Sequence, residues 1–171
     1  NLEELFEFKN PIVLLTTNNF RASHINNAKL ASLEAHMFKY RAKINGDFKE
    51  NIYPTSDILE LKIGAQIMML RNDTVLQRWQ NGTLGYISKL NSENVWVVIN
   101  DQEFRVDPTT WDNIEFRYNK DINKLEEHSK GQFTQVPVKL AWAITIHKSQ
   151  GQTFDNVIID MDNGAFTHGQ T

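Results

Sequence analysis

Residues 140–153 read LAWAITIHKSQGQT and join an apolar run to a polar loop. The apolar half has the length and composition of a buried strand. The polar half, residues 147–153, places an imidazole, an ammonium group, hydroxyl groups and two carboxamides around one glycine. A further apolar run, residues 157–159, follows it. Since α/β proteins bind their ligands at the ends of buried strands, residues 147–153 predict a candidate binding loop.

A matching unit lies near the N-terminal end of the chain. Residues 12–16 form a short apolar run, and residues 17–19, Thr-Asn-Asn, are of the kind that caps helices. Apolar residues at helical spacing follow, at Ala22, Ile25, Ala28 and Leu33. Strand, polar cap and helix together are the basic unit of an α/β domain.

The middle of the chain has the pattern of β-structure. Apolar and charged residues alternate over residues 38–44, and short apolar segments separated by turn residues continue over residues 58–106. These segments predict a small antiparallel barrel or sandwich. Residues 113–130 are polar and have no clear period, so we expect a loop there, with one helical turn at most.

The whole chain therefore predicts one α/β domain that is interrupted by a β module. We place the α/β domain at residues 1–55 and 134–171, and the β module at residues 56–133. A length of 171 residues suits one core with a small insertion.

Composition excludes several classes of protein. Because there is no cysteine, the chain can form no disulfide, thiolate metal site or cysteine nucleophile. No apolar run approaches the roughly 20 residues that span a bilayer, and the acidic start of the chain does not resemble a secretory signal. We therefore expect a cytoplasmic location. A net charge of −3 argues against strong binding of DNA by this chain alone.

Two groups of polar residues could contact phosphate. Lys148 can meet a phosphate as a point charge, and Gly151 lets the backbone approach a ligand or adopt a positive φ. Thr17 and Asn18 stand at a predicted helix start, where hydroxyls and amides can hold a phosphate oxygen. The alternatives are a solvated turn for the first group and plain helix capping for the second. Residue types alone favour both alternatives.

Other kinds of site find little support in the sequence. Asp160 follows an apolar run and could coordinate Mg²⁺, but the chain has no G-x-x-x-x-G-K-[ST] phosphate loop, so we predict a turn residue and no metal site. The five histidines form no zinc-binding pattern, and no G-x-S-x-G motif indicates a hydrolase. Some aromatic residues of the β module could stack bases, but we expect core packing for Trp79, Trp96, Trp111 and Phe116.

Residues 140–153 closely resemble motif V of superfamily-one DNA helicases of the Pif and RecD type. Three further stretches agree, in order, with motif IV, the entry into an inserted SH3-like module and the approach to motif VI. They are residues 15–19 with Ile25 and Asn26, residues 61–73 with residues 81–85, and residues 165–171. The resemblance spans nearly the whole chain.

This resemblance implies a P-loop NTPase-type α/β fold, the second RecA-like domain of a helicase, interrupted by a small SH3-like barrel. Family members carry their phosphate loop and Mg²⁺-binding acids in a first RecA-like domain. Their motif VI continues to a catalytic arginine that this sequence does not reach. The intact protein would use ATP and Mg²⁺ to move 5′→3′ along single-stranded DNA. We expect the chain alone to bind neither cofactor and to lack ATPase activity, because such an arginine stabilises the transferring phosphoryl group.

Motif V, carried over to this sequence, implies two groups of contact residues and no catalytic residue. The residues expected to face the DNA backbone are Thr17, Asn18, Thr145, His147 and Lys148. The residues expected to face the nucleotide are Gln150, Gly151 and Thr153. A loop that touches both ligands would couple DNA binding to ATP binding. The resemblance also implies a partner, which is the first RecA-like domain of the same protein. The alternative hypothesis is a nucleic-acid-binding or protein-interaction module without a motor, whose β barrel binds single strands.

Overall fold

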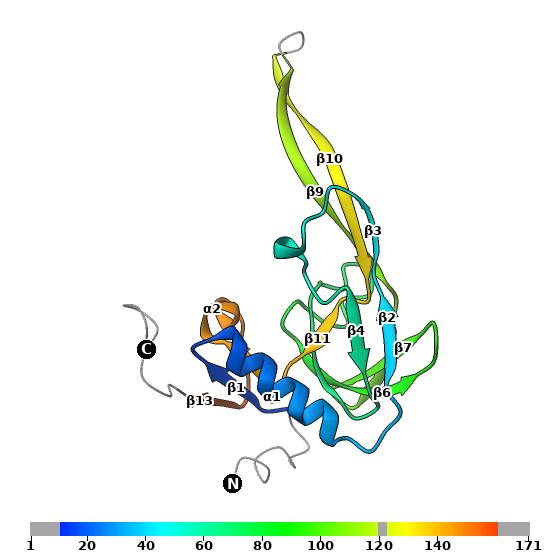
Figure 1. Ribbon diagram of the computed structural model, residues 1–171, viewed down its shortest axis with the longest axis vertical. Coiled ribbons are helices and arrows are strands. Elements are labelled where there is room, and N and C mark those ends of the chain that lie inside the picture. The colour runs from blue at the N-terminus through cyan, green and yellow to red at the C-terminus, as the bar shows by residue number, and fades with distance from the viewer. Residues whose placement is uncertain (1–10, 120–122, 161–171) are drawn as a thin grey trace.

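The computed structural model describes residues 11–119 and 123–160 (Figure 1). In chain order the elements are β1 (Val13–Thr16), α1 (Asn19–Ser32), β2 (Phe38–Arg41), β3 (Lys43–Gly46), the 3-10 helix η2 (Glu50–Ile52), β4 (Ile58–Leu61), β5 (Gln66–Met69), β6 (Leu84–Leu90), β7 (Val95–Ile99), β8 (Gln102–Val106), β9 (Thr109–Asn119), β10 (Lys124–Gln135), β11 (Val138–Leu140), β12 (Ala143–Thr145), α2 (Ile146–Ser149) and β13 (Val157–Asp160). The predicted approach to motif VI, residues 165–171, lies outside the described residues. Among the described helices, none is long and apolar enough to cross a membrane.

A parallel three-stranded sheet and helix α1 form the α/β part of the molecule (Figure 1). β1 lies in the centre, with β12 on one side and β13 on the other. α1 packs on this sheet through Ala22, which clusters with Leu14 and Ala143. The helix begins where the side-chain oxygen of Asn18 accepts a hydrogen bond from the backbone N–H of Arg21 at 2.7 Å. The strand, cap and helix predicted from the sequence are therefore confirmed.

The largest sheet is antiparallel and has the strand order β11-β5-β6-β7-β8. Its inward side chains, such as those of Ile67 and Val97, form most of the main core. β5 is buried on both faces, because Met68 points the other way and packs against Val13 and Ile144. The pairings within the described residues follow an open order, so they do not establish a closed barrel.

Two strand pairs join the segments on either side of the predicted boundary at residue 55. β2 pairs with β4 and β3 pairs with β10, and both pairs are antiparallel. Tyr40 of β2 lies in the main core together with residues of the antiparallel sheet. β2 and β3 therefore lie with the β-structure, although they precede residue 55.

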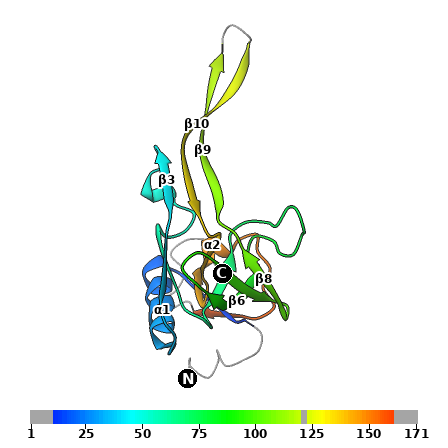
Figure 2. The ribbon, with the colours of Figure 1, turned by 90° about the vertical axis from the view of Figure 1, so that its right-hand side faces the viewer.

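The prediction of a loop over residues 113–130 is wrong, because β9 and β10 form a long antiparallel hairpin there (Figures 1 and 2). This hairpin, called the arm below, projects from the rest of the molecule. Its base is buried, since Phe133 packs against the rings of Phe48 and Trp111. Further out, strand pairing continues as far as Asn119 opposite Lys124. These strands could not be recognised from the sequence, because the outer part of the arm has no buried face and its residues therefore show no apolar period.

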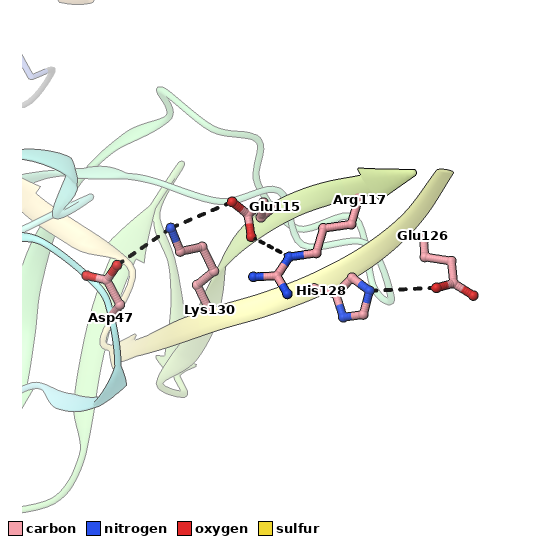
Figure 3. A network of polar contacts seen from close by, with 6 residues as sticks. All are labelled: Asp47, Glu115, Arg117, Glu126, His128 and Lys130. Atoms are coloured by element: carbon pink, nitrogen blue, oxygen red, sulfur yellow. Dashed lines mark hydrogen bonds and ion pairs between the residues drawn. The ribbon is translucent and has the colours of Figure 1, made fainter. Parts of the chain in front are cut away.

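Charged side chains meet at the base and along one side of the arm (Figure 3). Glu115 accepts a hydrogen bond from Arg117 at 2.8 Å and lies 4.0 Å from the ammonium group of Lys130. Lys130 also lies 3.7 Å from Asp47, which follows β3. Exposed ion pairs of this kind contribute about 0–1 kcal/mol each, so the backbone ladder is the main source of order in the arm.

The four aromatic residues predicted to pack in the core differ in their burial. Trp79 is buried, at 8% exposure, as the sequence predicts, and Trp96 and Trp111 are half-buried. Phe116, in the outer part of β9, is 61% exposed. The prediction that Phe116 packs in the core is therefore wrong, and the projection of the arm is the reason.

Candidate nucleic-acid interface

The carboxyl ends of β1 and β12 meet at one edge of the parallel sheet. The two strands are neighbours in register, with Thr16 opposite Thr145. The segments that follow them therefore start side by side. Together they surround a cavity of about 450 Å³, lined by Thr17, Asn18, Asn19, Thr145, His147 and Lys148. The structure thus brings to one place every residue that the sequence predicts to face DNA.

Hydrogen-bond donors and a cation line this cavity, and none of its lining residues in the described part of the chain is acidic. Thr17 and Thr145 are 7% and 4% exposed, whereas His147 and Lys148 are exposed. Asn18 uses its side-chain oxygen to cap α1, so its amide group can still donate to a ligand. Hydroxyls, an amide and a lysine are groups that proteins use to hold the phosphates of nucleic acids.

Helix α2 is a single turn that carries His147 and Lys148. The hydroxyl of Ser149 donates to the carbonyl oxygen of Ile146 at 2.6 Å, and the backbone N–H of Gln152 donates to the carbonyl oxygen of Ser149 at 3.1 Å. These bonds hold the loop after β12 in one compact turn. The hydroxyl of Ser149 is thereby engaged within the turn.

Gln150, Gly151 and Thr153 lie beyond α2 and do not line the cavity described above. All three residues are exposed. Gly151 has a φ of +75°, and a Cβ added there would meet nothing within 4 Å. The backbone conformation, rather than a lack of space, therefore favours glycine at this position. His147 and Lys148 of the DNA-facing group and the three nucleotide-facing residues thus occupy consecutive parts of one loop.

Gln152 is a contact that the sequence did not predict. Its side chain packs against Gly82, whose φ is +94°, and a Cβ added to Gly82 would lie 2.8 Å from the side-chain oxygen of Gln152. That oxygen is buried and has no hydrogen-bond partner among the described residues. Gly82 belongs to the turn before β6, so this contact links the loop after α2 to the antiparallel sheet. In the sequence, the dipeptide Asn81-Gly82 predicts a turn at this position but does not indicate its contact with Gln152.

Asn26 of α1 is the second residue that sequence reasoning did not place at the site. Its amide group donates to the carbonyl oxygen of Ala143 at 2.8 Å, and its side-chain oxygen accepts from the backbone N–H of Ala143 at 2.9 Å. The side chain thus binds β12 at the edge of the sheet, where a further strand would otherwise pair. Because Thr145 ends this strand, Asn26 helps to position the cavity.

Asp160 ends β13 and is not a turn residue. Its carboxylate accepts a hydrogen bond from the guanidinium of Arg21 in α1 at 2.5 Å. This ion pair ties the third strand of the parallel sheet to the first turns of the helix that covers it.

Comparison with known proteins supports a common origin with helicases. Residues 140–170 match the family described as the UvrD-like helicase C-terminal domain. The ATP-dependent DNA helicase Pif1 of Campylobacter jejuni is 30% identical over 190 residues, which cover 98% of this chain and 40% of that protein.

Solved structures of Pif1 from Bacteroides have the same fold as this chain. The structure in complex with ADP-AlF4 superposes with a TM-score of 0.80 at 32% identity, over 93% of this chain and 36% of that one. The structure bound to single-stranded DNA superposes with a TM-score of 0.76 at 33% identity, over 99% of this chain and 39% of that one. The chain spans less than half the length of each of these relatives. In sequence and in fold, the chain is thus related to a part of the superfamily-one DNA helicases of the Pif1 type.

Proposed function

We propose that this chain is part of an ATP-dependent DNA helicase that moves 5′→3′ along single-stranded DNA. The named relative from Campylobacter jejuni and the Bacteroides structures with single-stranded DNA and with ADP-AlF4 support this proposal. Since the chain covers only 40% of the Campylobacter protein, the activity belongs to the complete protein.

The observation that carries the proposal is the cavity at the ends of β1 and β12. Its lining, within residues 11–119 and 123–160, contains no carboxylate and combines hydroxyls, an amide and an exposed lysine. Thr145, His147 and Lys148 would contact the sugar-phosphate backbone of the strand, and Thr17 and Asn18 would support it from the α1 side. This chain would thus supply one half of the DNA track.

The nucleotide would bind on the other part of the same loop. Gln150, Gly151 and Thr153 offer a carboxamide, a backbone N–H and a hydroxyl, and these groups suit hydrogen bonds to phosphate oxygens. Within the described ranges, no group of three or more His, Asp or Glu residues could hold a metal ion. We assign the Mg²⁺ that would accompany ATP, together with the phosphate loop, to a first RecA-like domain in the complete protein. Hydrolysis of ATP, in which the terminal phosphoryl group is transferred to water and ADP leaves, would drive movement, and this chain would form the second wall of the ATP cleft.

The fold supports a corresponding division of the chain. β1, α1, β12, α2 and β13 would belong to a discontinuous second RecA-like domain, and the antiparallel strands between them to an inserted SH3-like module. The contact between Gln152 and Gly82 would transmit movement between these parts, because a shift of the loop after α2 displaces the turn before β6.

The decisive experiment measures ATP hydrolysis by the complete protein with and without single-stranded DNA. We expect stimulation by DNA, and unwinding of a duplex that carries a 5′ single-stranded tail but not of one with only a 3′ tail. Absence of ATP hydrolysis, with binding of single strands retained, would favour a nucleic-acid-binding module without a motor. Preference for the 3′ tail would contradict the proposed direction.

A further inference from the structure

A second groove, of about 540 Å³, lies between α1, residues 50–60 and the strands β11 and β12. Asn19, Thr145 and Lys148 line both this groove and the cavity at the strand ends, so the two spaces adjoin at these residues. Lys139 of β11 lines the groove but not the cavity. The groove therefore extends the proposed DNA track by a surface that includes one further lysine.

Lys139 stands in an unusual place for a lysine. Its neighbour Val138 points into the main core, so the alternation of the strand turns Lys139 toward the groove. Among the described residues, no carboxylate lies within 4.0 Å of its ammonium group, and none accepts a hydrogen bond from it. Burial and, to a smaller degree, the nearby charge of Lys148 lower the pKa of Lys139 to about 8.

Three carboxylates also line the groove, but they do not neutralise Lys139. Glu50, Asp57 and Glu60 all come from the wall formed by residues 50–60. Glu60 is already paired with Lys39 at 2.6 Å. The charge that acts most on Lys139 is the positive charge of Lys148.

We propose that Lys139 and Lys148 form a phosphate-binding pair that extends the DNA track from the cavity into this groove. The ligand is the sugar-phosphate backbone of a single-stranded polynucleotide, because two adjoining spaces with two separate lysines suit successive phosphates better than one isolated anion. The proposal rests on the proposed function, which it extends by one contact residue. A phosphate next to Lys139 supplies the counter-charge that the protein does not provide.

The pair has a consequence for the dependence of DNA binding on pH. A phosphate favours the charged form of Lys139, so the pKa of Lys139 is higher in the complex than in the free protein. Lys139 is charged in both states well below pH 8, and DNA binding is then strongest. As the pH rises through about 8, the free protein loses this proton first, and the affinity for DNA falls.

The experiment uses the complete protein and a short oligothymidylate, with the dissociation constant measured by fluorescence anisotropy between about pH 7 and pH 9. For the wild type we expect the affinity to fall by about five- to tenfold over this range, which corresponds to a pKa rise of one to two units on binding. Lys139→Met keeps the packing of the side-chain stem but removes the charge. It should bind more weakly at pH 7 and respond less to pH. Its plot of log affinity against log salt should be shallower by about 0.7, the value for one lost phosphate contact on a single strand.

Two further variants make the test specific. Lys139→Arg retains a charge at every pH, so it should bind nearly as well as the wild type at pH 7 and lose little affinity at pH 9. Lys89→Met, at an exposed lysine of β6 that pairs with Glu103 at 2.8 Å, should behave like the wild type. If the wild type binds DNA while Lys139→Met keeps its affinity, pH profile and salt dependence, the inference about Lys139 is overturned. If the wild type does not bind the oligonucleotide at all, the proposed function itself fails.

Discussion

The two hydrogen bonds between the side chain of Asn26 and the backbone of Ala143 in β12, called the Asn26 clamp below, offer the sharpest test of how the cavity is built. The side chain of Asn26 makes the hydrogen bonds that a neighbouring strand would make at this sheet edge. Its amide group donates to the carbonyl oxygen of Ala143 at 2.8 Å, and its oxygen accepts from the N–H of Ala143 at 2.9 Å. Replacement by alanine, Asn26→Ala, removes both hydrogen bonds but shortens the side chain without adding volume. The carbonyl and N–H groups of Ala143, which is 2% exposed, then lose their partners.

The expected cost follows from these two bonds. A hydrogen bond contributes about 1 kcal/mol net, and a buried polar group left without a partner adds a further penalty. Both bonds are partly buried, so water can replace some of the loss. We therefore expect a local destabilisation of about 2–3 kcal/mol. Since about 1.4 kcal/mol corresponds to a factor of ten, opening of β12 becomes more frequent by about 30- to 150-fold.

Hydrogen–deuterium exchange of the complete protein measures this opening directly. The amides of β12 should exchange faster by the stated factor, and single-stranded DNA should bind more weakly because Thr145 ends the same strand. The matched control for the exchange of β12 is Asn27→Ala, because the side chain of Asn27 is exposed on the same helix and makes no hydrogen bond among the described residues. Unchanged protection of β12 in Asn26→Ala would refute the view that this side chain holds the strand.

Three further predictions concern the loop after β12 and its support. Lys148→Ala should weaken binding of single strands and make its salt dependence shallower by about 0.7 in log–log slope, and unchanged binding would remove Lys148 from the track. Gln150→Ala should lower the rate of ATP hydrolysis more than the affinity for DNA, and kinetic assays that rank the two effects in the opposite order would contradict its assignment to the nucleotide. Gly82→Ala should destabilise the protein by about 1–3 kcal/mol in urea unfolding, because alanine is strained at a φ of +94° and its Cβ overlaps Gln152. Adding Gln152→Ala should restore part of that loss, and strictly additive effects would show that the overlap is unimportant.

Much of the α/β part could be predicted from the sequence. Residues 12–16 and 140–145 are short apolar runs that end in polar residues, and such a change is set by neighbours in the chain. The candidate site could be predicted at the ends of these runs, because α/β proteins generally bind their ligands at the carboxyl ends of buried strands. Lys148 and Gly151 stood out for the same reason, because their chemistry is visible in the residues themselves. The resemblance to motif V then supplied the roles that residue types alone left open.

The arm, the Asn26 clamp and the groove around Lys139 could not be predicted in this way. β9 and β10 are held by pairing with each other, and their outer part buries no face that would produce a periodic pattern. Asn26 meets Ala143 across more than a hundred residues of chain. In the sequence, Lys139 resembles any other lysine in a strand, and only the fold makes it half-buried and places it near Lys148.

The sequence by itself determined the apolar segments that contain β1, β12 and β13, and which residues carry phosphate-binding chemistry, because both depend on local order along the chain. It did not show that the segment around residue 140 is divided between β11 of the antiparallel sheet and β12 of the parallel sheet. Tertiary structure alone decided that Thr17 and Thr145 share one cavity, and that the turn at Gly82 supports the loop through Gln152. The physical reason is that strand register and side-chain contact join residues that are distant in the chain. The spacing of such residues in the sequence does not predict that they lie close together.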